Sequence, residues 1–354
     1  MDTCQTKRQG LLIAMCLSLA ACSSDKDPGT SASAVDAKNS PAEAQSPFDS
    51  SLFAEGALAG EPEIVDCTLS DGTATSCYKI VTAPVPVQDS IGPFCPRTTS
   101  TDASEAGIWL DGSGKVYDVD GEFILSLPQL YGAEGTYDDW ILYDEEGNVR
   151  VTDTREACEM AAVPDVDEAY KHHCVECSLE DVDGGISSTF LIPVNPVPAE
   201  RSGRVRNVGV SLTGAQLAGP APVDAILGNY TIAAFDDCGG HINPHEGYHY
   251  HAATGCTEIA AQSDGHAALL GYAMDGYPIY GELDAEGNEP GELDECRGQT
   301  DAVRGYHYHA ASAGENMFIG CFHGLTVAPP QGPGGRPPGP PGARPGPPPQ
   351  GEPE

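Results

Sequence analysis

Short apolar runs separated by turn-forming residues dominate the middle of the chain. The runs at 64–85 and 107–127 are alternating or apolar and are interrupted by Asp-Gly and Gly-Ser-Gly, and this pattern is typical of strands and tight turns. Two further runs at 140–143 and 148–154 flank the acidic sequence Asp-Glu-Glu-Gly, which predicts a hairpin. Strands separated by turns are therefore expected over most of this region.

The remaining runs extend the same pattern. Strands are predicted at 189–194, 203–212 and 225–234, and one short helix is predicted at 157–170. The 42 glycines and 30 prolines favour turns and loops over long helices. The sequence thus predicts a mainly β fold with short helices and long loops, sandwich-like or irregular. Its topology does not follow from the pattern.

The first residues have the features of an export signal. Lys7 and Arg8 precede an apolar run at 11–21, which is too short to span a bilayer but suits the core of a signal peptide. The run ends in Leu-Ala-Ala-Cys22, which resembles a bacterial lipobox. We expect Cys22 to become the lipidated first residue, whereas a simple secretory signal is the alternative. Ser23, rather than Asp, follows the cysteine and predicts sorting to the outer membrane.

Composition divides the chain into regions. Small and polar residues dominate after the predicted cleavage site, and Pro and Gly dominate the last residues; neither composition supplies enough apolar surface to order a chain. The predicted parts are a signal peptide at 1–21, a disordered tether at 22–61, a β-rich region at 62–191, a histidine-rich domain packed with it at 192–327, and a disordered tail at 328–354.

The chain is strongly acidic. It carries 17 Lys and Arg against 53 Asp and Glu, for a formal net charge of −36. Binding to nucleic-acid phosphates needs basic surface, so this charge excludes a nucleic-acid partner. The membrane, through the lipid on Cys22, is the one partner that the sequence predicts.

The cysteines indicate an oxidising compartment. The chain has 13 cysteines, and ten remain when Cys4, Cys16 and Cys22 are set aside. An even number in an exported chain predicts disulfides, although the sequence does not determine their connectivity. The candidate pairs are Cys67 with Cys77 across a predicted turn, Cys238 with Cys256, and Cys296 with Cys321. The Cys-Val-Glu-Cys sequence at 174–177 is followed by turn residues, which favours structural bridges over a redox pair.

Histidines are concentrated towards the C-terminal end of the chain. Eight of the ten lie between His241 and His323, and Tyr-His-Tyr-His occurs twice, 58 residues apart. On a strand, alternate residues share a face about 7 Å apart, so two imidazoles of one motif can share a metal ion. If the two strands were neighbours, four imidazoles would face one space. A metal-free network of His and Tyr hydrogen bonds is the alternative.

These motifs resemble the YHYH-domain proteins, a family of bacterial exported proteins and lipoproteins. The matching segments are Phe235-Asp-Asp-Cys-Gly-Gly-His241, Gly247-Tyr-His-Tyr-His251, Leu270-Gly-Tyr-Ala-Met-Asp-Gly-Tyr-Pro-Ile-Tyr-Gly281, Leu293-Asp-Glu-Cys-Arg-Gly298, Tyr306-His-Tyr-His309 and Gly320-Cys-Phe-His-Gly324. The resemblance is strong from about residue 192 to residue 324. It identifies the domain and implies no settled reaction. Gln299 stands where relatives have His, which argues against a ligand there.

Imidazole ligands suit copper or zinc, and we expect one of these ions between the two Tyr-His-Tyr-His strands. The expected metal ligands are His249, His251, His307 and His309, with His241 or His323 adding a ligand. Asp275 and His245 are expected to orient the ligand rings. Asp275 also suits a tight turn, in Met-Asp-Gly-Tyr.

Three classes of function remain open. The first is a metal-binding surface lipoprotein that stores, senses or delivers metal. The second is a metalloenzyme, hydrolytic or oxidative, for which Glu246 is the candidate general base because it lies beside His245 and near His249. The third is a disulfide-stabilised scaffold or adhesion module without metal.

Overall fold

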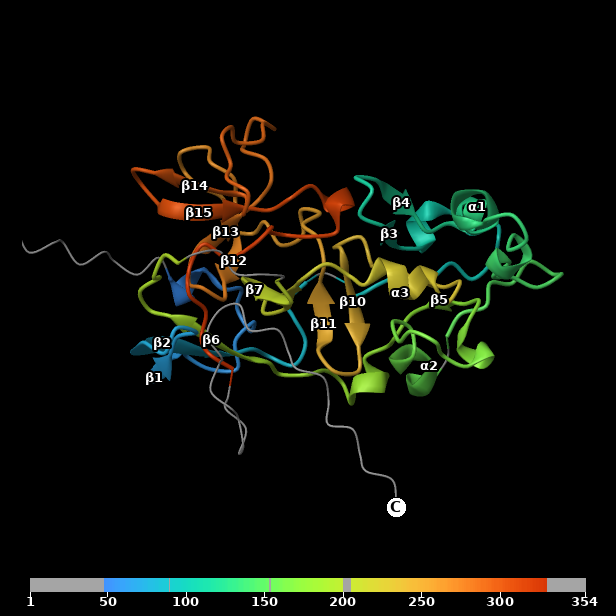
Figure 1. The fold of residues 1–354 in the computed structure, drawn as a ribbon, viewed down its shortest axis with the longest axis horizontal. Coiled ribbons are helices and arrows are strands. Elements are labelled where there is room, and N and C mark those ends of the chain that lie inside the picture. Colours follow the sequence, from blue (N-terminus) through green and yellow to red (C-terminus); the bar gives the residue numbers. More distant parts are fainter. Residues whose placement is uncertain (1–47, 89, 153, 200–204, 330–354) are drawn as a thin grey trace, which may run out of the picture. The chain divides into compact units, whose positions relative to one another are not determined.

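A computed structural model describes residues 48–329, except for 89, 153 and 200–204 (Figure 1). The fold is mainly β, as the sequence predicts, with several sheets, short helices and long connections. In this described part of the chain, no helix has both the length and the apolar character of a bilayer span. The predicted signal peptide, Cys22, most of the tether and nearly all of the tail lie outside the described residues.

A three-stranded antiparallel sheet, in the order β1-β2-β6, contains the first predicted hairpin. Its strands are β1 (Glu63–Thr68), β2 (Ala74–Val81) and β6 (Thr189–Pro193). Cys67 and Cys77 form a disulfide across the β1–β2 hairpin, which confirms the predicted pair. The turn is held by the Asp71 carboxylate, which accepts a hydrogen bond from the backbone of Thr73 (2.8 Å).

Residues 48–61, which composition assigns to the tether, pack on the domain instead. Phe53 and Ala57 are buried in a core cluster with residues of the sheets. The Phe48 ring stacks on Tyr78 at 4.4 Å and contacts Tyr272 at 4.8 Å between centroids. Two aromatic side chains in a small-residue segment supply the apolar surface that the remainder of the segment lacks. Residues 48–61 therefore belong to the folded domain rather than to a tether.

The run at 107–127 forms a hairpin and a helix rather than strands alone. Strands β3 (Ile108–Leu110) and β4 (Val116–Asp118) pair, and helix α1 (Gly121–Tyr131) follows directly. Asp120 caps the helix by accepting a hydrogen bond from the backbone of Phe123. Phe123, Ile124 and Leu127 are buried on one helical face. This spacing of i, i+1 and i+4 is helical rather than strand-like. The Asp120 N-cap favours a helix at this point of the run.

A smaller layer carries two disulfides that the sequence left unassigned. It contains helices α2 (Arg155–Glu159) and α3 (Val223–Leu227) and the parallel strands β5 (Cys174–Val175) and β9 (Ile232–Ala233). The helix predicted at 157–170 is thus shorter, and the strand predicted at 225–234 is partly helical. Cys174 bonds to Cys95, and Cys177 bonds to Cys158. The Cys-Val-Glu-Cys segment is therefore structural, as expected.

The largest sheet has eight strands in the order β10-β11-β8-β7-β12-β13-β15-β14. Its strands are β7 (Asn207–Ser211), β8 (Gln216–Ala218), β10 (Gly240–Asn243), β11 (Gly247–Tyr250), β12 (Leu269–Ala273), β13 (Pro278–Tyr280), β14 (Gly298–Asp301) and β15 (Gly305–His309). In Figure 1 the β10–β11 hairpin is gold and the β14–β15 hairpin is orange. The sheet thus begins and ends in a hairpin that carries one Tyr-His-Tyr-His motif.

The strand order reads as two equivalent halves that meet at β7 and β12. In each half an antiparallel pair (β7–β8 or β12–β13) continues through a parallel contact (β8–β11 or β13–β15) to the outer hairpin. The central pair, β7 with β12, is antiparallel, as a twofold relation between the halves requires. The repeated motif in the sequence therefore reflects a repeated structural unit.

Two glycines allow the halves to meet. A Cβ atom on Gly209 would lie 2.0 Å from the carbonyl oxygen of Tyr272, and one on Gly271 would lie 2.1 Å from that of Val210. Both contacts are with backbone atoms in the middle of the sheet, so no side-chain rotation relieves them. Only glycine permits this approach of β7 and β12.

Replacement of either central glycine by alanine should therefore destabilise the whole domain. We expect Gly209→Ala and Gly271→Ala each to lower the free energy of unfolding by more than about 2 kcal/mol, the range of core strain, measured by thermal and denaturant unfolding. Gly291→Ala is the control because a Cβ there meets nothing within 4 Å. Equal stability of all three variants would contradict the proposed role of the glycines.

Candidate metal centres

Three histidines of the β10–β11 hairpin converge on one point, here called the first centre. His241 on β10 faces His249 on β11 in the antiparallel register, and His251 follows at the end of β11. One ligand atom of each ring lies within 4.8 Å of the other two. His249 and His251 are buried, and His241 is partly exposed. Alternation along β11 thus directs two rings to one side, as the sequence predicts.

Backbone carbonyls orient the rings of the first centre. Nδ1 of His249 lies 3.0 Å from the carbonyl oxygen of Gly247, and Nδ1 of His251 lies 2.7 Å from that of Gly219. A carbonyl only accepts, so each Nδ1 carries the proton and donates. Each Nε2 then has a free lone pair, and the two Nε2 atoms lie 3.1 Å apart. Two lone pairs that face each other are unfavourable unless a cation lies between them.

His266, His307 and His309 form the second centre, at the other end of the sheet. Nδ1 of His307 donates to the carbonyl oxygen of Gly305 (2.9 Å), and Nδ1 of His309 donates to that of Gly281 (2.9 Å). Nδ1 of His266 lies 3.1 Å from the carbonyl oxygen of Ala267, and its Nε2 lies 3.2 Å from Nε2 of His307. The second centre therefore repeats the carbonyl-held rings of the first, but its facing pair is His266 with His307, and the Gln299 side-chain nitrogen donates to Nε2 of His307 (3.3 Å).

The glycine before each motif supplies one of the orienting carbonyls. Gly247 and Gly305 have φ values of 71° and 67°, in the left-handed region that glycine adopts without strain. Each closes its hairpin turn and turns its carbonyl towards the histidine two residues later. The five-residue sequence Gly-Tyr-His-Tyr-His thus encodes both the turn and the orientation of a ligand ring.

Near neutral pH these histidines are not protonated, so protons do not relieve the repulsion between the Nε2 lone pairs. Burial lowers the pKa of His251 to about 3 and that of His309 to about 4, and it lowers the pKa values of His241, His249 and His307 as well. Neutral rings with converging Nε2 atoms are the form in which histidine binds metal. In a tetrahedral site with metal–nitrogen bonds of about 2.0–2.1 Å, ligand nitrogens lie about 3.3 Å apart. The Nε2–Nε2 distances of His249 to His251 (3.1 Å) and of His266 to His307 (3.2 Å) are close to this value.

The structure gives two three-histidine centres in place of one site with four imidazoles. Four strands (β8, β7, β12 and β13) lie between β11 and β15, so the two Tyr-His-Tyr-His strands are not neighbours. Each half instead completes its own set with a third histidine. The expectation of a single shared ion failed because it assumed that the two copies of the motif pair with each other.

Three expected site residues lie outside both centres. The His323 ring stacks on Tyr306 at 3.7 Å, and the backbone N–H of His323 donates to the Tyr308 hydroxyl.

Asp275 accepts hydrogen bonds from the Tyr308 hydroxyl (2.6 Å) and the Gly324 N–H (2.8 Å), and burial raises the pKa of Asp275 to about 6. His245 is exposed in the β10–β11 turn. Carbonyl oxygens, rather than Asp275 or His245, orient the buried rings.

His266 is the candidate ligand that sequence reasoning missed. In the register of the second hairpin Gln299 faces His307, as His241 faces His249 in the first. Gln299 therefore holds the place of the third ligand, and its Nε2 lies 3.0 Å from Nε2 of His309. His266 arrives from the loop before β12 and replaces the missing ring. The absence of histidine at position 299 was the one sequence signal for this residue. A three-histidine set in the second half then needs its third histidine from elsewhere in the chain.

The first tyrosine of each motif bonds to an aspartate at the base of its own hairpin, just before β10 or β14. Tyr248 donates to Asp236 (2.9 Å), and Tyr306 donates to Asp294 (2.9 Å). These two aspartates also accept backbone N–H groups of the turns that contain Cys238 and Cys296. The disulfides Cys238–Cys256 and Cys296–Cys321 are formed, which confirms both predicted pairs.

The two centres differ in the charge beside them. In the first, a carboxylate oxygen of Glu246 lies 3.7 Å from Nε2 of His249. Burial raises the pKa of Glu246, but the electrostatic interaction with the His249 ring and the hydrogen bonds donated by the Asn243 and Gln216 amides outweigh it, so the net shift is downward. In the second hairpin Arg304 occupies the corresponding position before the glycine, and it pairs with Asp264 and Asp301.

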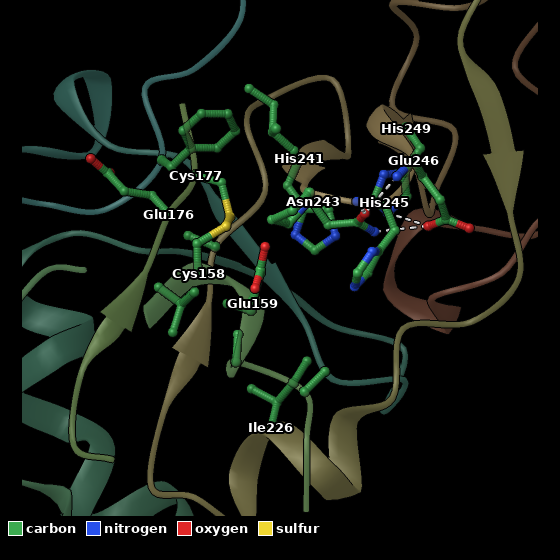
Figure 2. Close-up of a pocket in the computed structure, with 18 of the residues that line it drawn as sticks. Cys158, Glu159, Glu176, Cys177, Ile226, His241, Asn243, His245, Glu246 and His249 are labelled. Carbon is green, nitrogen blue, oxygen red and sulfur yellow. Dashed lines mark hydrogen bonds and ion pairs between the residues drawn. A yellow bond between two sulfur atoms is a disulfide. The ribbon is translucent and has the colours of Figure 1, made fainter. Parts of the chain in front are cut away.

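The first centre opens on a cavity of about 340 Å³. Figure 2 shows His241, His249 and Glu246 on one side of this cavity and the Cys158–Cys177 disulfide on the other. The remaining wall is largely apolar and includes Phe94, Val175 and Ile226. The imidazoles of the first centre are therefore reachable through an apolar chamber.

Residues 189–291 match the family described as YHYH protein. The chain carries a YHYH domain. The matched segment contains the first centre and His266, and it ends before the second Tyr-His-Tyr-His. Comparison with curated proteins and with solved structures gave no match. The YHYH domain of this chain thus corresponds to one complete half of the sheet and the beginning of the other.

The histidine from the loop, rather than the one near Cys321, should control metal binding at the second centre. We expect His266→Ala to remove one equivalent of bound metal, because His266 supplies a third of that ligand set. His323→Ala should leave the metal content unchanged. Elemental analysis of dialysed protein measures both, and the reverse result would exclude the assignment of His266.

Proposed function

We propose that this protein binds copper or zinc ions at two separate three-histidine centres, for metal storage, sensing or delivery. The observation that carries the proposal is the pair of facing Nε2 lone pairs of His249 and His251 in the first centre, 3.1 Å apart. In the second centre His266 and His307 face each other at 3.2 Å, and the Gln299 amide also donates to His307. Their Nδ1 atoms are committed to carbonyl oxygens, so neither neutral ring can donate to the other. A cation removes this repulsion, and imidazole is a good ligand for both metals.

The proposal includes export and attachment to the membrane by lipid at Cys22, in the cell envelope and on the outer membrane. The signal-like first residues and the Leu-Ala-Ala-Cys22 sequence support it. Five disulfides in the described part of the chain also support it, since such bonds persist in oxidising compartments. The same bonds remove thiolates as ligands and leave histidine as the main metal-binding side chain.

The test is stoichiometry. Untagged protein from an oxidising compartment should hold two equivalents of metal after reconstitution and dialysis, His249→Ala and His307→Ala should each hold one, and the double variant none. Mass spectrometry should show intact disulfides in every variant. A single equivalent that either substitution removes would indicate a shared site, and no metal in the wild type would overturn the proposal.

Stability provides an independent check against a metal-free scaffold. A ligand that binds only the folded state raises its stability by mass action, so a chelator should lower the melting temperature of the loaded protein. The double variant should melt at the same temperature with and without chelator. A wild-type melting temperature that chelation does not change would support the scaffold alternative instead.

A metal-dependent hydrolase is a second candidate, favoured by one observation at the first centre. Glu246 is ionised and lies 3.7 Å from His249. It is not one of the three residues of the first centre, because its oxygens do not lie within 4.8 Å of all three ligand nitrogens. A carboxylate at that place suits a general base that takes a proton from water at the centre. Its hydrogen bonds to Asn243 and Gln216 hold it there (2.8 and 3.0 Å).

Glu246→Gln should separate the two functions. We expect the variant to keep two equivalents of metal and to lose about 100-fold in the hydrolysis of p-nitrophenyl acetate, a typical general-base effect. Glu159→Gln, which changes a carboxylate of the same cavity, should retain activity. Unchanged turnover in Glu246→Gln, with metal present, would remove this residue from any mechanism.

A further inference from the structure

The cavity beside the first centre has the size and the surface of a small-molecule site. Its volume of about 340 Å³ is roughly twice that of a ~150 Å³ apolar cavity that holds benzene. It also lies within the range of ligand pockets, about 300–1,000 Å³. Phe94, Val163, Val175, Ile226 and Ile242 line it. An occupant of one or two rings, or an equivalent aliphatic body, fits this space.

The carboxylates at the wall do not make the cavity a cation site. Glu176 pairs with Arg97 (2.6 Å) and accepts the backbone N–H of Cys95 (3.1 Å). Glu159 pairs with Arg155 on the same helix. With these charges compensated, the body of an occupant meets mainly apolar atoms, and burial of apolar surface supplies the binding energy.

The first centre offers the occupant one polar anchor. Three histidine ligands leave a tetrahedral ion with one open position, and the cavity is lined by all three rings of this centre. Glu246, on the same side of the cavity in Figure 2, would accept a hydrogen bond from a group bound there. An apolar chamber with one such anchor matches the usual composition of ligand sites.

The second centre lacks this arrangement. Arg304 stands in the place of Glu246 and is fixed by Asp264 and Asp301. The hollow beside the second centre is lined by acidic and small residues, including Asp264, Asp284 and Glu286. An apolar occupant has no matching surface there, so the two centres differ in what they can bind.

We infer that the cavity binds a small, mainly apolar molecule whose nitrogen or oxygen head coordinates the metal of the first centre. The inference rests on the proposed function, because the head needs the metal. It assigns the two centres different tasks: the first exchanges a ligand, and the second does not.

The test compares 4-phenylimidazole with imidazole, which share a metal-binding head and differ in the apolar body. Calorimetric titration uses two zinc-loaded proteins that each retain one centre, His307→Ala for the first and His249→Ala for the second. We expect the first centre to bind 4-phenylimidazole at least tenfold more tightly than imidazole. The second centre should bind the two equally.

Two substitutions in the cavity wall place the preference in the cavity, both made in the His307→Ala background. Val163→Asp puts a charge at a position that is 43% exposed and therefore tolerant, and Ala161→Trp fills space from the partly buried rim. Each should reduce the preference for 4-phenylimidazole at least threefold and leave imidazole binding unchanged. Val303→Asp, at an 80% exposed position of the second hairpin, is the matched control and should change neither.

Elemental analysis of the same samples separates failure of this inference from failure of the proposed function. One equivalent of zinc with equal affinity for both compounds at the first centre would overturn the inference alone. So would a preference that the wall substitutions do not change in zinc-loaded, folded variants. Absence of zinc in both single-centre proteins would overturn the metal centres and the inference together.

Discussion

The hydrogen bond from each buried histidine Nδ1–H to a backbone carbonyl is the constraint on which both centres depend. One carbonyl belongs to the left-handed glycine before the motif (Gly247 or Gly305), and the other to the residue that directly follows the adjacent parallel strand (Gly219 or Gly281). The sheet itself, rather than a carboxylate, therefore selects the tautomer. Every Nε2 lone pair is then directed inward, where burial makes both repulsion and protonation costly.

The same constraint explains why the two halves share a scaffold and differ in chemistry. The carbonyls are backbone groups, so the side chains around them differ between the two halves without loss of ring orientation. His241 of the first half corresponds to Gln299 in the second, where His266 replaces it from a loop. Thr213 and Asp275 likewise occupy equivalent places and bond Tyr250 (3.1 Å) and Tyr308 (2.6 Å), respectively. At these positions the two halves thus differ in side chain while the main-chain carbonyls still orient the rings.

Local patterns were predictable from the sequence, and long-range pairing was not. The first hairpin, three disulfides and the same-face placement of His249 and His251 follow from turns, spacing and the period of two. The contact of β11 with β8, and of β15 with β13, is parallel and joins distant segments, so no turn encodes it. For that reason the sequence suggested one site where the sheet holds two, and His266, in a loop without a motif, had no local signal.

The two hairpin turns give the centres different electrostatic surroundings. A carboxylate about 4 Å from a cation interacts with it strongly at a partly buried site, where the effective dielectric constant is about 20. Glu246 supplies this negative charge at the first centre, and the hydrogen bonds donated by Asn243 and Gln216 stabilise its charged form. Arg304 at the second centre brings a positive charge that two aspartates already balance, so that turn offers no base. One exchange of Glu for Arg thus places a carboxylate beside the first three-histidine group and an ion-paired guanidinium beside the second.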